Sequence, residues 1–296
     1  MNKLHLIYII IVNYNGWNDT LQCIESLNQI DYNNYKVVVV DNDSQESYDK
    51  IMMEKYPDVI FIQAGENLGF AGGNNIGIDR ALSDNADYVL LLNNDTIVDP
   101  EFLSNIIEKV KEEKNIGIAT GKIYYHDNKN ILWYAGGRFS NLKGNAYHFG
   151  TDEVDRGQFD VDKEVTFISG CYMLIPKEVI KTVGNLSEEY FLYHEDVDYC
   201  LKVAKKGYKL MYYPNSIIYH KVSASTGKKS KMYEYYYNRN RCILIDKNLR
   251  FPYKHISFMF FYLTRIFKLF FGEQRNSIVW RALGDYKKRR WGYQKI

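Results

Sequence analysis

The first half of this 296-residue chain alternates short apolar runs with segments of helical periodicity. The apolar runs are rich in β-branched residues and almost free of polar positions, as expected of strands covered on both faces of a mainly parallel sheet. Between them, apolar residues recur at helical spacing, as at Leu21, Ile24 and Leu27. The pattern predicts an α/β fold with a mainly parallel central sheet flanked by helices. The predicted strands are residues 6–12, 37–40, 59–62 and 88–92.

The regular alternation stops after Gly117, where turn-rich stretches indicate a more mixed sheet with longer loops. Residues 196–206 have helical periodicity and end before Gly207, a residue type that often follows a helix. Residues 209–213 and 216–219 then have the composition of strands. A second, less regular half of the domain is therefore expected.

Charge is distributed unevenly along the chain. The net charge is +2, but residues 1–220 hold 20 Lys and Arg against 32 Asp and Glu, whereas residues 221–296 hold 18 against 4. Such asymmetry indicates an anionic partner for the basic part. The candidates are nucleic acid and an acidic membrane surface.

An amphipathic helix is predicted within the basic part, at residues 254–271. Phe261 interrupts its polar side, and its uninterrupted apolar runs are shorter than the about 20 residues that a membrane-spanning helix needs. A helix lying on a membrane surface and a helix packed on the domain both remain open. The polar positions of the helix are Lys254, Ser257, Thr264, Arg265 and Lys268.

The four cysteines are scattered without a C-x-x-C pair, which argues against a zinc ribbon, a redox motif and a disulfide framework. The N-terminal apolar run passes directly into the polar residues 13–16 with no small-residue cleavage site. We interpret it as a buried strand and not as a signal peptide. A cytoplasmic protein is expected.

Polar residues follow the first two predicted strands. Asn13 and Asn15 come after the first strand, and Asp41 ends the second. Ligands of parallel α/β sheets bind at the carboxyl ends of the strands, so these side chains could hydrogen-bond to a nucleotide base or ribose. A loop of Asx turns would explain the same residues.

A glycine-rich segment, residues 66–75, leads into another helical pattern. Backbone N–H groups in such a segment can approach a phosphate closely. The segment has neither the G-x-G-x-x-G pattern nor the lysine of a P-loop, which argues against dinucleotide binding and ATP hydrolysis. A close-packed turn remains the alternative.

Asn94 and Asp95 follow the fourth predicted strand. A carboxylate beside amide groups suits a hard divalent ion that keeps water ligands and bridges a diphosphate. His220 ends a later predicted strand and is a candidate for the second metal ligand, although a single histidine is more often structural.

Three carboxylates, Glu195, Asp196 and Asp198, crowd at the start of the helix predicted at 196–206. Crowded acidic groups raise one another's pKa, which favours a general base or a metal site. Carboxylates also complement the dipole at a helix N-terminus, so a helix cap is an equal alternative.

In this order, these motifs resemble those of the family 2 glycosyltransferases, in particular the rhamnosyltransferase-like members. The resemblance covers residues 9–247. It implies a GT-A fold and an inverting transferase that uses a nucleotide sugar with Mg²⁺ or Mn²⁺. The motifs that carry it are residues 12–15, 40–44, 66–75, 92–95, 169–171, 194–198 and 237–241.

The resemblance also implies a donor site. Asn13, Asn15 and Asp41 match positions that hold the nucleotide. Asp95 matches the metal-binding last residue of the D-x-D element, whose first Asp is Asn93 here, so the metal has fewer charged ligands. The other donor-side residues that it implies are Asn67, Gly69, Phe70, Asn75 and Asn94.

On the acceptor side, Asp196 matches the catalytic base, and Glu195 and Asp198 would tune or orient it. Gly170 and His194 would contact the acceptor. Two arginines in a tyrosine-rich element could clamp a phosphate, although a set of salt bridges on a helix face is equally expected. These arginines are Arg239 and Arg241.

We expect residues 1–248 to form a GT-A domain, with residues 1–120 binding the nucleotide sugar and residues 121–248 the acceptor. Residues 249–296 would form a basic amphipathic helical tail that associates peripherally with the anionic inner face of the cell membrane, and not with nucleic acid.

The expected function is transfer of a sugar, with rhamnose as the first candidate, from a dTDP- or UDP-linked donor to a lipid-linked or polysaccharide acceptor in cell-surface glycan synthesis. The alternatives are a sugar-nucleotide pyrophosphorylase and a non-catalytic carbohydrate-binding module. The first normally has an early glycine-rich loop with Arg and Lys, which residues 13–17 lack.

Overall fold

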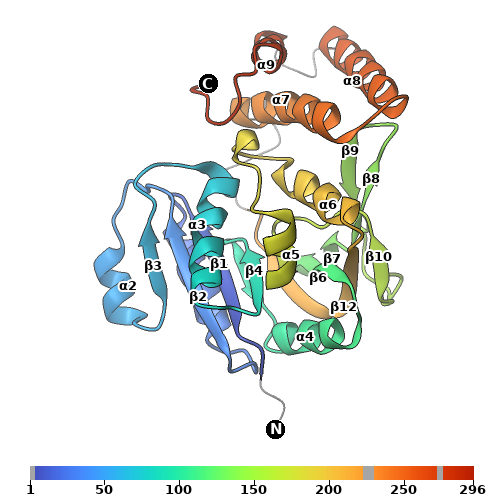
Figure 1. Ribbon diagram of the computed structural model, residues 1–296. Helices are drawn as coiled ribbons and strands as arrows, with labels where there is room; N and C mark the ends of the chain where they lie inside the picture. The colour runs from blue at the N-terminus through green and yellow to red at the C-terminus, as the bar shows by residue number, and fades with distance from the viewer. Residues whose placement is uncertain (1–3, 223–229, 272–275) are drawn as a thin grey trace.

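The computed structural model describes residues 4–222, 230–271 and 276–296. A large sheet carries helices on both faces, and three C-terminal helices form a layer at the end of the molecule opposite the N-terminus (Figure 1). The predicted α/β class is confirmed. The strands are β1 (Ile7–Asn13), β2 (Tyr35–Asp41), β3 (Ile60–Gln63), β4 (Tyr88–Leu92), β5 (Thr96–Val98), β6 (Ile116–Tyr125), β7 (Asn128–Tyr134), β8 (Gly137–Ser140), β9 (Asn145–His148), β10 (Lys163–Val165), β11 (Tyr172–Pro176) and β12 (Lys209–His220). The helices are α1 (Trp17–Leu27), α2 (Asp49–Lys55), α3 (Gly69–Ser83), α4 (Phe102–Glu112), α5 (Lys177–Val183), the 3₁₀ helix η1 (Glu188–Tyr190), α6 (Glu195–Lys205), α7 (Lys231–Asn248), α8 (Tyr253–Phe270) and α9 (Asn276–Lys287).

The main sheet is parallel in its N-terminal half and mixed beyond it. β3, β2, β1 and β4 are parallel neighbours in that order. β11 runs antiparallel between β4 and β6, and β12 pairs in parallel with β6. Because β1, β2 and β4 are parallel, the polar residues that follow them meet at one edge of the sheet.

Helix α3 packs directly on β1 because glycines leave room at the contact. A Cβ atom at Gly73 would lie 2.7 Å from Val12 Cγ1, and one at Gly77 would lie 2.5 Å from Ile10 Cγ2. Helix α3 begins at Gly69, so most of the glycine-rich segment 66–75 is helical and is not a loop. Within this segment, Gly73 serves helix–strand packing.

The two strands predicted at 209–213 and 216–219 form one strand, β12. Its pairing with β6 shifts between Tyr213 and Ile217, around Pro214. An irregularity of this kind absorbs the turn-forming residues and lets the strand continue.

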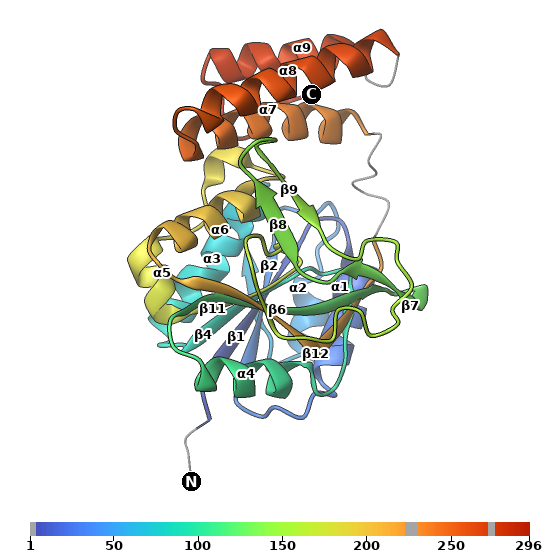
Figure 2. The ribbon, with the colours of Figure 1, turned by 90° about the vertical axis from the view of Figure 1, so that its right-hand side faces the viewer.

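Helices α7, α8 and α9 lie together as one layer over the rest of the molecule (Figure 2). The Tyr235 hydroxyl on α7 donates to Asp285 Oδ2 on α9 at 2.7 Å. The Arg265 side chain on α8 donates to Asn238 Oδ1 on α7 at 3.0 Å.

The faces of α8 are oriented with the polar positions inward. Ser257 and Arg265 are buried, and Phe261, which interrupts the polar side, is fully buried between them. The Ser257 hydroxyl donates to the carbonyl of Asn141. Polar partners beneath the helix therefore hold its polar side against the protein.

The apolar side of α8 consequently faces outward. Four apolar side chains on successive turns of this side are 58–61% exposed. No helix in the described ranges is both long and apolar enough to cross a bilayer. The four residues are Met259, Leu263, Ile266 and Phe267.

Candidate active site

A connected set of polar side chains occupies the carboxyl ends of β1 and β2. Asn13 Nδ2 donates to Asp41 Oδ1 and to Ser44 Oγ, both at 2.9 Å. Ser44 Oγ donates to Asp41 Oδ1 at 2.5 Å and accepts the backbone N–H of Asn15 at 2.8 Å. Asn13 and Asp41 are buried, whereas Asn15 is exposed. Asn13 and Asp41 are thus held in place inside the protein, and Asn15 is accessible from solvent.

Asn94 and Asn67 extend this edge on both sides. Asn94 Nδ2 donates to Thr20 Oγ1 at 3.1 Å, and Thr20 Oγ1 donates to Asn13 Oδ1 at 2.8 Å. Asn67 Oδ1 accepts the backbone N–H of Gly69 at 3.0 Å and the side chain of Asn42 at 3.2 Å. Most of the predicted donor-side residues therefore lie along one edge of the sheet.

Asp95 and His220 meet although 125 positions separate them in the chain. Asp95 precedes β5, and β5 pairs with the end of β12, where His220 lies. His220 Nε2 is 3.0 Å from Asp95 Oδ1, and both side chains are buried. Burial disfavours the charged imidazole, but Cys171 and the Asp95 carboxylate outweigh it and raise the pKa of His220.

This pair fits the protein part of a Mg²⁺ or Mn²⁺ site. Asp95 Oδ1 and His220 Nε2 are hydrogen-bonded at 3.0 Å. Loss of the proton from Nε2 would free both atoms as ligands, and two ligands in adjacent octahedral positions, each about 2.1 Å from an ion, are also about 3 Å apart. Within the described ranges, no group of three or more His, Cys, Asp or Glu side chains is arranged to hold a metal. The remaining ligands would therefore come from a diphosphate and water.

The segment 169–171 joins this pair to the predicted base. The backbone N–H of Gly170 donates to Asp196 Oδ2 at 3.1 Å. The next residue, Cys171, interacts with His220 through its thiol and accepts the backbone N–H of Asn93 at 3.0 Å. A Cβ atom at Gly170 would lie 2.7 Å from the Phe70 ring, so Phe70 also lies beside this segment.

Asp196 is the second residue of α6 and is half-buried. Burial raises the pKa of Asp196 to about 6, against the opposing effect of backbone N–H groups of Gly170 and Val197. Burial and the neighbouring Asp196 raise the pKa of Glu195 well above its ordinary value. A carboxylate that is ionised at neutral pH, yet more basic than an exposed one, suits general base catalysis.

Asp198 makes other contacts than those predicted. Its Oδ1 accepts the Tyr190 hydroxyl at 3.0 Å and Asn248 Nδ2 at 2.7 Å, and Lys202 Nζ lies 2.7 Å from its Oδ2. These contacts tie α6 to η1 and α7. Asp198 thus holds the helix in place, and none of them reaches Asp196.

The backbone before Asp196 is strained. Phe191, Tyr193 and His194 have φ values of 63°, 70° and 75°, a region that non-glycine residues rarely adopt. Such conformations cost about 1–3 kcal/mol each and persist only when surrounding structure holds them. Gly69 supports this segment through close backbone contact. A Cβ atom at position 69 would lie 2.1 Å from the Phe191 carbonyl oxygen, so the contact requires a glycine there.

Arg239 and Asn240 on α7 hold this strained segment. Asn240 Nδ2 donates to the carbonyls of Tyr190, Leu192 and Tyr193 at 2.7–3.0 Å. The Arg239 guanidinium is fully buried and donates to four backbone carbonyls. Those carbonyls belong to Glu189, Tyr190, Arg290 and Gly292. The structure therefore gives Arg239 a positioning role, in place of the phosphate clamp expected from the sequence.

Asn75 also differs from its predicted role. Its side chain donates to the Leu186 carbonyl at 3.0 Å and to Glu188 Oε1 at 2.8 Å. It is buried and does not face the nucleotide edge, because it lies inside α3. Asn75 thus anchors the segment that leads to η1.

His194, which was predicted to contact the acceptor, precedes α6 and faces Asn145. It is buried, and its Nε2 is 3.3 Å from Asn145 Oδ1. Burial, helped by the charge of Arg241, lowers the pKa of His194 to about 3. The imidazole is therefore neutral at physiological pH and can donate or accept a hydrogen bond.

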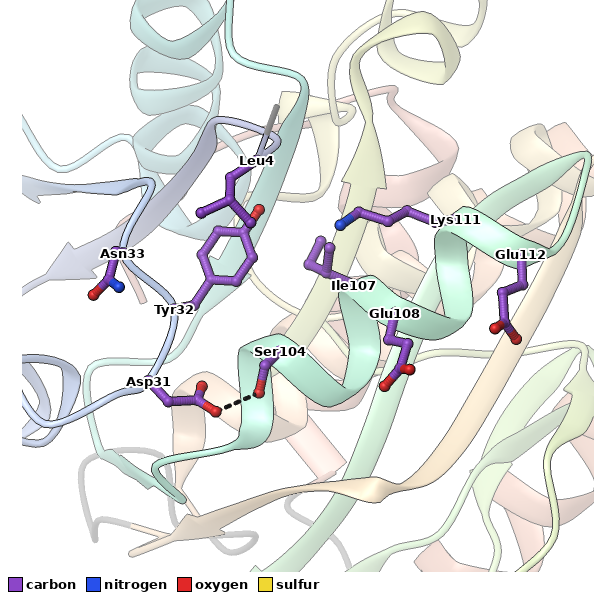
Figure 3. Close-up of a pocket in the computed structure, with 9 residues that line it drawn as sticks. All are labelled: Leu4, Asp31, Tyr32, Asn33, Ser104, Ile107, Glu108, Lys111 and Glu112. Carbon is purple, nitrogen blue, oxygen red and sulfur yellow. Dashed lines mark hydrogen bonds between the residues drawn. The ribbon is translucent and has the colours of Figure 1, made fainter. Parts of the chain in front are cut away.

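An open hollow at the other end of the molecule is unrelated to these residues (Figure 3). It is lined by Leu4, Asp31 and Tyr32, which precede β1 and β2, and by the outer face of α4. Ser104 Oγ donates to Asp31 Oδ2 there at 2.9 Å. It lies at the amino ends of the parallel strands, opposite the edge where such sheets bind ligands.

Residues 8–184 match the family model described as glycosyl transferase family 2. The chain belongs to this family. The resemblance found in the sequence is thereby confirmed, and the protein is a glycosyltransferase. Asp196 and His220 lie outside the matched residues, so their assignment rests on the geometry above.

Among characterised relatives, this family 2 enzyme is similar to rhamnosyltransferase WbbL of Escherichia coli K12. They are 27% identical over 217 residues, which are 71% of this chain and 81% of the relative. It is 26% identical over 283 residues to dTDP-rhamnosyl transferase RfbF of Shigella flexneri, covering 92% of this chain and 90% of the relative.

Solved structures share its fold. A mannosyltransferase of Pyrobaculum calidifontis, in complex with GDP-Man and Mn²⁺, superposes with a TM-score of 0.60 at 17% identity, covering 88% of this chain and 70% of the other. GalNAc-T7 with UDP, GalNAc and Mn²⁺ gives 0.64 at 14% identity, covering 91% and 58%. The predicted GT-A architecture is confirmed.

Several residues around the site were not predicted. Trp133 of β7 packs edge-on against His220, with ring centroids 4.5 Å apart. Asn145 bonds to Tyr237, and Asn240 holds the strained segment. Arg265 appears in the sequence only as a polar position of an amphipathic helix. Each of these residues makes its contact with a residue more than 25 positions away in the chain, so no local sequence pattern indicates it.

Proposed function

We propose that this glycosyltransferase is a metal-dependent inverting hexosyltransferase of glycan synthesis. Asp196 would act as the base, and Asp95 with His220 would hold Mg²⁺ or Mn²⁺. The observation that supports this most is the segment 169–171, whose neighbouring residues contact Asp196 and His220. A base and a metal site on one short segment suit a direct displacement at a single sugar carbon.

In the proposed reaction, Asp196 accepts the proton of an acceptor hydroxyl as that oxygen bonds to the anomeric carbon. The bond from this carbon to the diphosphate breaks, and its electron pair leaves with the nucleotide. A bound divalent cation would supply charge stabilisation to the departing diphosphate. A single displacement needs one base, so Glu195 and Asp198 have no proton-transfer role.

Rhamnose from dTDP-rhamnose is the donor that we propose to test first. The support is that two relatives are described as rhamnosyltransferases, and one of them aligns over nearly the whole chain. Neither a pyrophosphorylase nor a non-catalytic binding module would account for the family membership or for the raised pKa of Asp196.

The test is turnover of a panel of dTDP-, UDP- and GDP-sugars with a lipid diphosphate-linked sugar as acceptor. One donor should be consumed with Mg²⁺ or Mn²⁺ and not with EDTA. The anomeric configuration of the product, measured by NMR, should be opposite to that of the donor. Retention of configuration would overturn the proposed direct displacement.

We further propose that α8 lies on the anionic inner surface of the cell membrane. The supporting observation is its outward apolar side, which is flanked by exposed apolar residues such as Phe251 and Trp280. Exposed Arg250, Arg281 and Arg289 belong to the same layer, and an anionic surface attracts each such cation by about 1 kcal/mol.

Liposome flotation tests this location. Wild-type protein should float with vesicles that contain phosphatidylglycerol, and the double variant Leu263→Glu, Phe267→Ser should not. Both side chains are about 60% exposed, so the double variant should keep the fold. Equal flotation of the two proteins would refute the proposal.

A further inference from the structure

Two buried arginines lie on facing helices of the C-terminal layer. Arg241 of α7 and Arg265 of α8 are only 3% and 7% exposed. Their guanidinium carbons lie 5.2 Å and 5.3 Å from the centroid of the same ring, that of Phe261. Two like charges are thus held beside one aromatic side chain.

Both guanidinium groups bond only to neutral partners. Arg241 donates to the carbonyls of Lys143 and Gly144, and Arg265 donates to Asn238 Oδ1. Arg265 Nε is buried and has no hydrogen-bond partner. Within the described ranges, neither arginine forms an ion pair with a carboxylate. Among the described residues, the pair therefore has no carboxylate counter-ion.

Such an arrangement destabilises the ligand-free protein. Burial lowers the pKa of Arg241 and of Arg265, and the charge of Arg265 lowers that of Arg241 further. Buried charges are ordinarily paired because desolvation of an unpaired ion is expensive. An anion bound by both groups would offset this penalty and would accept charge-assisted hydrogen bonds from them, including one from the unpartnered Arg265 Nε.

The pair lies beside the acceptor side of the catalytic site. The charge of Arg241 influences His194, which is two residues from Asp196. Tyr237 bridges the two places, because its ring centroid lies 4.7 Å from that of His194 and its hydroxyl accepts Asn145 Nδ2 at 2.7 Å. Tyr237 and Asn145 are half-buried and reach the surface.

We infer that Arg241 and Arg265 form a binding site for a phosphate group of the acceptor. This deepens the proposed function and rests on it, since it names the acceptor as a phosphate-linked glycan lipid. The donor diphosphate would be held elsewhere, at the sheet, through a divalent cation bound by Asp95 and His220. The outward apolar side of α8 lies on the same helix as Arg265, so one helix would meet both the lipid surface and the phosphate.

The probe is geranyl diphosphate, a short soluble lipid diphosphate, added to the full chain in EDTA without donor. At saturation it should raise the melting temperature of the wild type by about 5 °C. Inorganic pyrophosphate tests whether the phosphate alone suffices. Replacing one guanidinium, as in Arg241→Met or Arg265→Met, should weaken binding by about 10- to 100-fold.

The matched control is Lys287→Gln, which removes an exposed cation of α9 from the same layer and should leave binding unchanged. Without probe, Arg265→Met should melt at the same temperature as the wild type or higher, because an unpaired buried charge is replaced by an apolar side chain of similar length. A lower melting temperature for Arg265→Met, or an unchanged response to the probe, would overturn the inference.

A second set of measurements distinguishes failure of the phosphate site from failure of the proposed function. With Mn²⁺ present, dTDP or UDP should raise the melting temperature of Arg265→Met as much as that of the wild type. In transfer assays, the variant should show a KM for the phosphate-linked acceptor raised about 10- to 100-fold and an unchanged KM for the donor. Loss of the nucleotide response with a retained diphosphate response would count against the donor site and leave the phosphate site standing.

Discussion

At the carboxyl ends of β1 and β2, buried polar side chains satisfy one another, whereas between α7 and α8 two buried cations in the described structure have no anionic partner. Asn13, Asp41 and Ser44 form a closed set of hydrogen bonds. Arg241 and Arg265 donate only to neutral oxygens. The polar groups of the first region satisfy one another without a ligand, whereas the second region would be stabilised by a bound anion.

Asp196 lies between these regions, and its removal should have the largest effect. Asp196→Asn keeps the shape of the side chain and the bond from Gly170 but cannot accept a proton. Transfer should fall by about 10²- to 10⁴-fold, the usual contribution of a general base. Initial-rate kinetics measure the loss, and nucleotide binding by calorimetry should match the wild type. Transfer at the wild-type rate would remove Asp196 from the role of base.

Arg239 sharpens the comparison because it is buried like Arg265 yet has a full set of partners. Arg239→Met would leave four backbone carbonyls without their donor and release the strained segment before Asp196. We expect a loss of about 3 kcal/mol in the free energy of unfolding and a melting temperature lower by about 6 °C or more. The same substitution at Arg265 should not lower it. Equal losses of unfolding free energy in Arg239→Met and Arg265→Met would contradict the claim that only Arg239 has a full set of partners.

These two arginines also mark the limit of what the sequence could predict. The strands and the polar residues after them follow from local patterns. His220 could be named as a candidate from its place at a strand end, but the pairing of β5 with β12 that brings it to Asp95 could not. The partners of Arg239 are backbone carbonyls about 50 positions away, which have no sequence signature.

The orientation of α8 was beyond prediction for a related reason. Its pattern has a polar and an apolar side, and for a surface helix the polar side ordinarily faces water. Here Ser257 and Arg265 find partners beneath the helix, so the order is reversed. Likewise, Gly73 belongs to the segment that could have been a phosphate-binding loop, but its missing side chain lets α3 pack against Val12.

Asp95→Asn tests the metal end of the donor region. Replacing the carboxylate by an amide removes the one charged oxygen ligand that the structure offers beside His220. Loss of one ligand should weaken the metal site and lower transfer by about 10- to 100-fold at limiting Mn²⁺. Titration of activity with Mn²⁺ measures this, and excess metal should restore part of the rate. A variant with unchanged metal dependence would place the ion elsewhere.

The pH dependence of turnover follows from the raised pKa of Asp196. The base works only when ionised, so activity should be constant above its pKa of about 6 and fall as the pH decreases through that value. At pH 5 the turnover number should be about tenfold below its plateau. Rates at saturating donor and acceptor across pH 4.5–8 measure the profile. A limb near pH 4 would indicate a carboxylate that burial does not perturb.

Glu195 should give the smallest effect, and for that reason it is the strictest control for Asp196. The two carboxyl groups are adjacent, and burial together with the charge of Asp196 raises the pKa of Glu195 well above its ordinary value, which favours its neutral form. Glutamine is a neutral group of the same size, so Glu195→Gln should turn over within about threefold of the wild type and keep the acidic limb near pH 6. A hundredfold loss with the limb abolished would instead assign the base to Glu195, and the contact of Gly170 with Asp196 would then serve only to begin α6.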